Sequence, residues 1–171
     1  TFLFDGVNDH VVFPDSPSLR YVGNNLSVFS WAKPTIDVTT SRNIVARRNA
    51  SNIGGYILHN SGNNSLLCYV YRSNWGSASY ANVYEPNKWC YVGFTYNGSQ
   101  LKLYKNGKYL TAVNLTGDIN PVESTTRIGS NGRNSQPWRG HIANVHIYNS
   151  ALTNDEILYN YLQLKGRFGL S

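Results

Sequence analysis

Residues 89–107 read WCYVGFTYNGSQLKLYKNG, and this stretch decides the fold. Apolar or aromatic residues alternate with other residues along Lys88–Tyr96 and again along Gln100–Lys105, which is the period-2 pattern of a β-strand with one buried face. Asn97-Gly98 and Asn106-Gly107 follow the two runs. Asn-Gly is a preferred pair for a two-residue hairpin turn, because both turn positions need a positive φ. The stretch therefore predicts consecutive antiparallel strands.

The same pattern recurs along almost the whole chain. Turn residues such as Asn131-Gly132 and Gly54-Gly55 separate the runs. The further predicted strands are Phe2–Phe4, His10–Phe13, Ser27–Ala32, Asn43–Ala46, Tyr56–His59, Leu66–Arg72, Tyr109–Leu115, Thr125–Gly129 and Ile142–Tyr148. Many short strands without βαβ spacing indicate an all-β protein, a two-sheet antiparallel β-sandwich.

One short helix is predicted at the C-terminal end. Thr153 and Glu156 have the spacing of a capping box, in which the Thr hydroxyl caps the helix and the Glu carboxylate reaches back. The apolar residues that follow at spacings of three and four are Ile157, Leu158, Tyr161 and Leu162. We expect a single domain over residues 1–165 and a tail over residues 166–171, with fraying of the chain after Gly166.

Charge and composition narrow the class of protein. The chain has 171 residues, of which 14% are charged, against about 25% in an average soluble domain. Its 15 basic and nine acidic residues give a net charge of +6, and polarity comes instead from 22 Asn and 13 Tyr. No apolar run approaches the roughly 20 residues of a membrane span. The chain opens without a leader pattern, which fits a removed signal peptide or an excised domain, and the composition favours an extracellular or cell-surface module.

The two cysteines fall on the aliphatic side of their predicted strands. Cys68 alternates with Leu66 and Val70, and Cys90 shares a side with Val92. If the two strands are neighbours, a disulfide between them would stabilise the fold by roughly 3 kcal/mol and would imply an oxidising compartment. The alternative is two buried free thiols, which are common core residues.

Five motifs in chain order resemble one known family. The chain has FDGVNDHV at residues 4–11, NLSVFSWAKP at 25–34, WCYVGFTYNGS at 89–99, LKLYKNG at 101–107 and WRGHIANVHIYNSALT at 138–153. These resemble the FDGxxDxV, FTxxxWVKP, WHxVAxTYDGS, LxLYVNG and FxGxIDEVRIYNRALS motifs of laminin G-like domains in the concanavalin A-like lectin and glucanase superfamily. The resemblance implies a concanavalin A-like jelly roll that binds through one sheet face or through rim loops.

The resemblance also raises the question of a structural calcium ion. In related glucanase-type sandwiches an acid in the closing motif helps to hold calcium, and this chain has Ala143 at that position. Asp5 and Asp9 remain as oxygen ligands, whereas calcium takes six to eight oxygens. The alternative is that Asp5-Gly6 is an ordinary turn. We expect no other cofactor. His10, His59, His141 and His146 lack the spacing of a zinc site.

The scarcity of acids argues against catalysis. A glycoside hydrolase on this fold needs two carboxylates about 5–10 Å apart. The close acid pairs are Asp5 with Asp9 and Asp155 with Glu156, and the second pair is explained by the helix N-terminus. No G-x-S-x-G nucleophile motif is present. We therefore predict a non-enzymatic protein, with glycan cleavage as the least favoured alternative.

Aromatic and polar residues suggest a ligand-binding surface. Tyr side chains project from the non-core side of the two cysteine strands, and Trp75, Tyr80 and Trp138 fall in predicted loops. Aromatic rings pack on sugar C–H surfaces, while Arg and Asn donate hydrogen bonds. The candidate binding residues are Tyr69, Tyr71, Tyr91, Trp75, Tyr80, Arg72, Arg133, Asn134 and Trp138. The alternative is that outward Tyr residues are simply good strand formers.

The sequence thus predicts a non-catalytic extracellular recognition module that binds glycan or a surface protein. Basic groups such as Arg42, Arg47 and Arg48 favour an anionic partner. No nucleic-acid motif and no membrane insertion are expected, and other domains of a parent chain are further partners. The alternative is a structural domain of a larger surface protein or filament without a small ligand. Glycosylation sequons occur at Asn25, Asn49, Asn63, Asn97 and Asn114.

Overall fold

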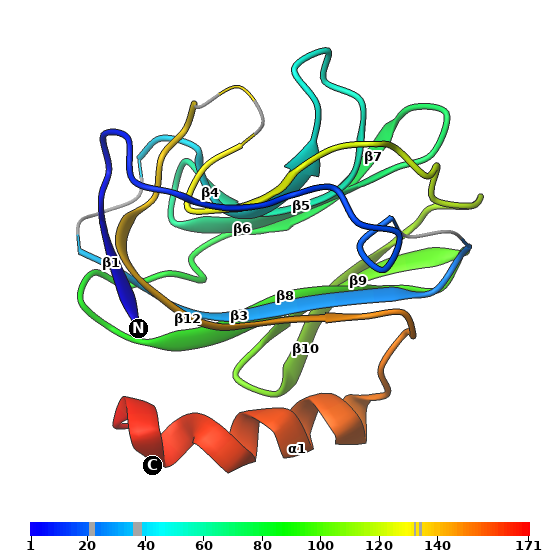
Figure 1. The fold of residues 1–171 in the computed structure, drawn as a ribbon. Coiled ribbons are helices and arrows are strands. Elements are labelled where there is room, and N and C mark those ends of the chain that lie inside the picture. Colours follow the sequence, from blue (N-terminus) through cyan, green and yellow to red (C-terminus); the bar gives the residue numbers. More distant parts are fainter. Residues whose placement is uncertain (21–22, 36–38, 132, 134) are drawn as a thin grey trace.

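The computed structural model describes residues 1–20, 23–35, 39–131, 133 and 135–171. Two six-stranded antiparallel sheets stack as two layers, and a helix lies beside one of them (Figure 1). Sheet A has the order β1-β12-β3-β8-β9-β10, and sheet B has the order β2-β11-β4-β5-β6-β7. The strands are β1 (Phe2–Asp5), β2 (Val11–Phe13), β3 (Leu26–Pro34), β4 (Arg42–Arg48), β5 (Gly54–Ser61), β6 (Ser65–Tyr71), β7 (Trp75–Tyr80), β8 (Cys90–Tyr96), β9 (Gln100–Lys105), β10 (Lys108–Asn114), β11 (Thr126–Ile128) and β12 (Arg139–Tyr148). The predicted all-β jelly-roll sandwich is confirmed.

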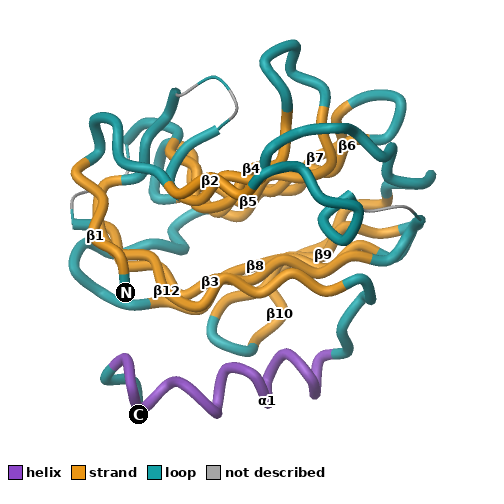
Figure 2. Tube along the Cα trace, in the orientation of Figure 1, coloured by secondary structure: helices purple, strands orange, loops and turns teal. Residues whose placement is uncertain are grey.

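The main core lies between the two sheets. Strands β3 and β8 of sheet A and β4, β5 and β6 of sheet B contribute inward residues, among which Val28, Phe94, Leu58 and Val70 are fully buried. Alternating residues of each strand point into this layer, as the period-2 pattern requires. Figure 2 shows that the segments joining the strands run around the ends of the two layers.

Strand β7 was expected to be a loop, and that expectation was wrong. Its residues Trp75–Tyr80 pair with β6 in register, with Trp75 opposite Tyr71. The segment is rich in Gly, Ser and Ala, which are weak strand formers by propensity. Packing requires the small residue Gly76, because a Cβ there would lie 2.3 Å from a methyl carbon of Leu115.

The two Asn-Gly pairs form different turns. Asn106 and Gly107 have φ values of 50° and 77° and join Lys105 to Lys108 directly, so the predicted two-residue hairpin is confirmed. At the other pair only Gly98 has a positive φ, 78°. The Asn97 side chain instead accepts hydrogen bonds from the backbone amides of residues 99 and 100, which builds a longer turn.

The C-terminal helix covers the outer face of sheet A (Figure 1). Helix α1 (Asn154–Leu164) begins with the predicted capping box between Thr153 and Glu156. A 3₁₀ turn, η1 (Lys165–Phe168), follows it. Phe168 stacks on Trp31 with ring centroids 4.3 Å apart and is only 8% exposed, so the expected fraying after Gly166 was wrong for this residue. No helix among the described residues is long and apolar enough to cross a membrane.

The cysteines face the core as predicted, but the predicted disulfide is not formed. Cys68 and Cys90 are free and buried. Strand β6 pairs with β5 and β7, whereas β8 pairs with β3 and β9. The two cysteine strands therefore belong to opposite sheets, and the assumption that they are neighbours was wrong. The Sγ of Cys90 donates to the carbonyl oxygen of Ala32 at 3.4 Å.

Both thiols are expected to resist alkylation in the folded protein. Burial raises the pKa of Cys90 to about 12 and that of Cys68 well above its usual value, so neither forms the reactive thiolate near neutral pH. Mass spectrometry after iodoacetamide treatment without a reductant measures this. We expect no label on native protein and two labels after denaturation. An unlabelled denatured protein would show a disulfide instead.

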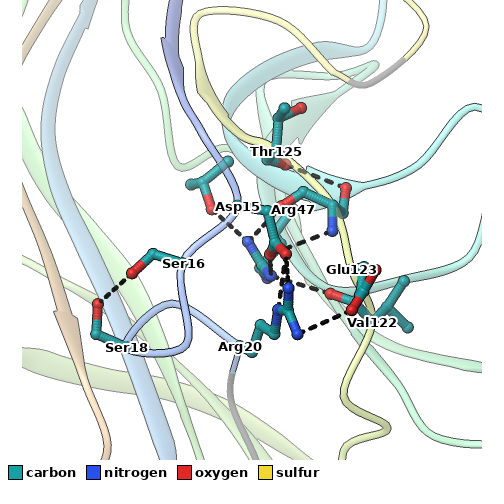
Figure 3. Close-up of polar contacts among 10 residues, drawn as sticks. Asp15, Ser16, Ser18, Arg20, Arg47, Val122, Glu123 and Thr125 are labelled. Atoms are coloured by element: carbon teal, nitrogen blue, oxygen red, sulfur yellow. Dashed lines mark hydrogen bonds and ion pairs between the residues drawn. The ribbon is translucent and has the colours of Figure 1, made fainter.

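A buried arginine ties sheet B to two distant segments. Arg47 on β4 is 1% exposed and donates to the Asp15 carboxylate and the Val122 carbonyl at 2.7 and 2.9 Å. Its other terminal nitrogen donates to the Ser124 carbonyl at 2.7 Å. Arg20 holds the opposite side of the same carboxylate, so Asp15 lies between two guanidinium groups (Figure 3). These groups, Arg20 first, hold the pKa of Asp15 well below its usual range.

Replacing Arg47 with Met tests this network. The buried oxygens that Arg47 holds would lose their donor, so we expect the free energy of unfolding to fall by about 3 kcal/mol. Urea denaturation measures the change. Lys88→Ala is the control, since Lys88 forms an exposed ion pair with Glu85 and its loss is expected to be far smaller. Equal losses in the two variants would contradict the anchoring role.

Candidate functional site

The outer face of sheet B brings a group of polar and aromatic residues together through strand register. Ile57 on β5 pairs with Tyr69 on β6, and His59 on β5 pairs with Asn43 on β4. Residues directly opposite each other in an antiparallel sheet share a face. Trp75 on β7 extends the same face next to the β6 residues. Helix α1 covers the outer face of sheet A, and no helix formed by the described residues lies over this face of sheet B (Figure 1).

A pocket of about 220 Å³ opens on this face. Strands β4 to β7 supply its floor and one wall, and three loops, which carry Ser41, Asn52 and Gln136, supply the rest. The lining residues are Ser41, Asn43, Arg48, Asn52, Ile57, His59, Tyr69, Trp75 and Gln136. None of these nine described residues is Asp or Glu. We call this the sheet B pocket.

Its aromatic wall is held in place by ring contacts and one hydrogen bond. The Trp75 ring packs edge-on against Tyr69 and Tyr71, with centroids 5.9 and 5.1 Å apart. The Trp75 indole N–H donates to the carbonyl oxygen of Asn52 at 2.9 Å. Asn52 also accepts from Arg48 Nη1 at 2.7 Å through its side chain. One asparagine therefore fixes both the aromatic wall and the arginine.

Two almost fully buried polar side chains line the pocket with unused hydrogen-bonding atoms. His59 is 5% exposed, and neither ring nitrogen has a partner among the described residues. Asn43 is 1% exposed; its amide nitrogen donates to Gln136 Oε1 at 3.1 Å, while its Oδ1 has no partner there. A buried polar group without a partner costs about 1–3 kcal/mol. Such groups are therefore candidates for contact with a bound molecule.

Burial also sets the protonation state of His59. It lowers the pKa of His59 to about 4, and the nearby positive charge of Arg48 adds to the effect. The ring is therefore neutral near pH 7, and one nitrogen donates a hydrogen bond while the other accepts one. A neutral imidazole beside an amide oxygen suits a ligand rich in hydroxyl groups, because each hydroxyl both donates and accepts.

The structure brings together only some of the predicted binding residues. Tyr69 and Trp75 line the sheet B pocket, and Tyr71 supports the Trp75 ring. Arg133 lies beside the pocket, where its Nε donates to the carbonyl oxygen of Ala50 at 2.9 Å. Asn134 lies outside the described residues.

Four other predictions fall away from the pocket. Tyr91 is 1% exposed on the opposite sheet, in the aromatic cluster beneath α1, and Trp138 is fully buried in the main core. Both were therefore wrongly assigned to a ligand surface. Tyr80 lies at the end of β7 opposite Leu66, a core residue, so it is on the core-facing side of the strand and not on the pocket side. Arg72 instead bridges two turns by donating to the Thr116 carbonyl and the Asn74 side chain.

Arg48, His59, Asn43, Asn52 and Gln136 were missed as pocket residues. The signal that would have found the first three is their outward phase on strands β4 and β5, which are central in the sheet. Polar side chains in this phase project from the outer face of the sheet, where they can contact a bound molecule. Asn52 and Gln136 carry no such signal, because both lie in loops with positive φ values of 64° and 56°.

The proposed calcium ligands form a turn. Asp5 Oδ1 accepts from the Val7 amide at 2.7 Å, and Asp9 Oδ2 accepts from the Asp5 amide at 3.0 Å. The bond from Val7 is the main cause that lowers the pKa of Asp5. No group of three His, Cys, Asp or Glu residues with metal-site geometry occurs among the described residues. The turn accounts for both carboxylates, and calcium binding there stays a prediction.

The five sequon asparagines lie in turns and at strand ends. Asn25, Asn63, Asn97 and Asn114 are exposed, and Asn49 is half-buried because its side chain accepts from the amides of residues 51 and 53. Their glycosylation stays a prediction.

Sequence comparison places the chain in a family. A laminin G model described as the concanavalin A-like lectin/glucanases superfamily matches residues 5–158. The chain belongs to this family, as its motifs predicted. No curated protein matches it in sequence.

Solved structures with the same fold have little sequence identity to the chain. The binding domain of botulinum neurotoxin serotype G superposes with a TM-score of 0.75 at 15% identity, over 95% of this chain and 42% of that one. Botulinum neurotoxin type C, whose cell entry is dependent upon interaction with two ganglioside molecules, gives a TM-score of 0.68 at 16% identity, over 91% of this chain and 40% of that one. A heptameric pentraxin from Limulus polyphemus gives 0.60 at 16% identity, over 89% and 81%. The chain thus spans less than half of the toxin chains it resembles, and at such identities the likeness shows the fold.

The buried neutral state of His59 makes folding stability depend on pH. The unfolded histidine titrates near pH 6.5, whereas the pKa in the folded protein is about 4. Between these values the unfolded chain binds the additional proton, so stability falls as pH falls. Between pH 7 and pH 4 we expect the titration of His59 to lower the free energy of unfolding of the wild type by up to about 3 kcal/mol. Urea denaturation at both pH values measures this free energy for the wild type and for His59→Gln. The decrease is expected to be smaller in His59→Gln by the His59 contribution, and equal decreases would contradict the assignment.

Proposed function

We propose that this chain is a non-catalytic, extracellular or cell-surface recognition module that binds glycan through the sheet B pocket. The observation that carries the proposal is the pair of buried side chains, His59 and Asn43, whose unused polar atoms line a pocket walled by Trp75 and Tyr69. An apolar ring face together with converging hydrogen-bonding groups is the chemistry that recognises a sugar.

The composition of the pocket supports binding without hydrolysis. Glycoside hydrolysis requires two carboxyl groups flanking the scissile bond, and the described lining residues include no carboxylate. Solved structures with the same fold also favour a binding role: they include toxin binding domains, and the cell entry of botulinum neurotoxin type C is dependent upon interaction with two ganglioside molecules. These likenesses support a binding role and leave the ligand of this chain to experiment.

The size of the pocket limits what it holds. Its volume of about 220 Å³ is below the roughly 300–1,000 Å³ of sites that enclose a drug-sized ligand. One sugar ring, the terminal residue or a side branch of a glycan, is the unit that we expect to occupy it, with the rest of the glycan lying over the outer face of sheet B.

Glycan-array binding of the whole chain tests this function. Trp75→Ala removes the aromatic wall and His59→Gln changes the buried polar group, so we expect each to weaken binding at least tenfold. Tyr159→Ala on α1 is the matched control, because Tyr159 is 62% exposed on the other side of the molecule. Circular dichroism confirms that each variant is folded. Absence of binding to every glycan class, or equal loss in the control, would overturn the proposal.

A further inference from the structure

Two consecutive arginines on β4 differ in whether their charge is paired with a carboxylate. Arg47 points inward, and its charge is balanced by the Asp15 carboxylate at 2.7 Å. Arg48 points outward and lines the sheet B pocket. The ion pairs among the described residues do not include Arg48. One guanidinium group is thus neutralised within the fold, and its neighbour is held at a pocket with no ion-pair partner in the described part of the chain.

The guanidinium of Arg48 is held by one hydrogen bond, and a further N–H donor has no partner among the described residues. Its Nη1 donates to the side-chain oxygen of Asn52 at 2.7 Å, which fixes the group in space. Its Nε is buried and has no partner among the described residues. A guanidinium presents its five N–H donors in a planar fork, which matches the two oxygens of a carboxylate. Arg48 therefore offers a fixed donor to an acceptor that enters the pocket.

Other positive charge lies close by. Burial lowers the pKa of Arg48, and the charge of Arg133 lowers it further. Arg48 in turn disfavours protonation of His59. The positive charges repel one another, and partial burial weakens the screening that water would provide. A negative group beside Arg48 would relieve this repulsion, whereas a neutral ligand would leave it in place.

We propose that the sheet B pocket selects an acidic sugar, with the sugar carboxylate on the Arg48 guanidinium and the sugar ring against Trp75. The hydroxyl groups of the ring then contact Asn43 and His59, which have unused acceptor and donor atoms. The inference rests on glycan binding at this pocket and adds the class of sugar. A uronic acid and a sialic acid share this carboxylate chemistry.

The test compares an acid with its neutral isostere. Binding of glucuronic acid and of glucuronamide to the whole chain is measured by NMR titration at constant ionic strength, with N-acetylneuraminic acid and glucose 6-sulfate as further probes. We expect wild-type protein to bind glucuronic acid or N-acetylneuraminic acid at least tenfold more tightly than glucuronamide. The stronger of these two acids identifies the source of the carboxylate.

Arg48→Gln is expected to bring this acid-to-amide ratio down to about one, and Arg48→Lys, which keeps the charge without the fork, to an intermediate value. Arg167→Gln is the matched control, since it removes the same charge from an exposed position in η1, and its ratio is expected to equal that of the wild type. Thermal melting shows whether each variant is folded.

Three results would overturn the inference. Binding of glucuronic acid and of N-acetylneuraminic acid by the wild type no tighter than that of glucuronamide would remove the acid preference while leaving glycan binding intact. Tighter binding of glucose 6-sulfate than of either glucuronic acid or N-acetylneuraminic acid would show that the pocket selects a sulfate group instead. An unchanged ratio in Arg48→Gln would place the selectivity elsewhere. Failure of all four probes, together with an empty glycan array, would instead refute the proposed function itself.

Discussion

The buried charge of Arg47 is the constraint on which this sandwich depends. A guanidinium at 1% exposure is tolerable only with full hydrogen bonding, and Asp15 and the carbonyl groups of residues 122 and 124 provide it. These partners come from segments far apart in the sequence, so the charge fixes how the chain crosses the end of sheet B. Because successive strand residues face opposite ways, anchoring Arg47 inward also directs Arg48 outward. The core anchor and the candidate site are thereby coupled on one strand.

Helix α1 covers the outer face of sheet A and not that of sheet B. On sheet A, Trp31 stacks on Phe168 and Tyr161, and Ile157 completes an aromatic and apolar cluster. Ala143 belongs to this cluster and is 7% exposed, opposite Trp31 in the strand register. A carboxylate at this position would be buried among aromatic rings without a partner. The position that is acidic in the family motif is thus apolar here for a local packing reason, and the described helix covers sheet A and not the outer face of sheet B (Figure 1).

Local sequence patterns predicted the strands other than β7, the hairpin at Asn106-Gly107 and the capped helix, because these depend on neighbouring residues. Alternation defined two sides of each strand but not the sheet to which a strand belongs. Cys68 and Cys90 both faced the core as expected, yet from opposite sheets, and Tyr91 faced outward beneath the helix. Asn144 has a positive φ of 48° and lies within the register shift of β12. It interrupts the alternation of the strand, and this interruption could not be predicted from the residue types.

The candidate site was predictable only in part for the same reason. Tyr69 and Trp75 carry a recognisable aromatic signal, whereas Asn52 and Gln136 enter the pocket through loop geometry. Pairing of β4 with β5 places His59 beside Asn43, and this pairing joins residues that no local pattern connects. Sequence therefore identified the residues of one wall of the pocket, while strand register and loops determined the rest.

The contacts made by Asn52 affect the kinetics expected for the proposed glycan binding. It holds the Trp75 indole through its carbonyl group and the Arg48 guanidinium through its side chain, in a left-handed backbone conformation. The two groups are thus oriented before any ligand arrives, so little side-chain entropy remains to be lost on association. A preorganised site of this kind binds without a slow rearrangement step. Differences in affinity between related ligands are then expressed chiefly in how long each one stays bound.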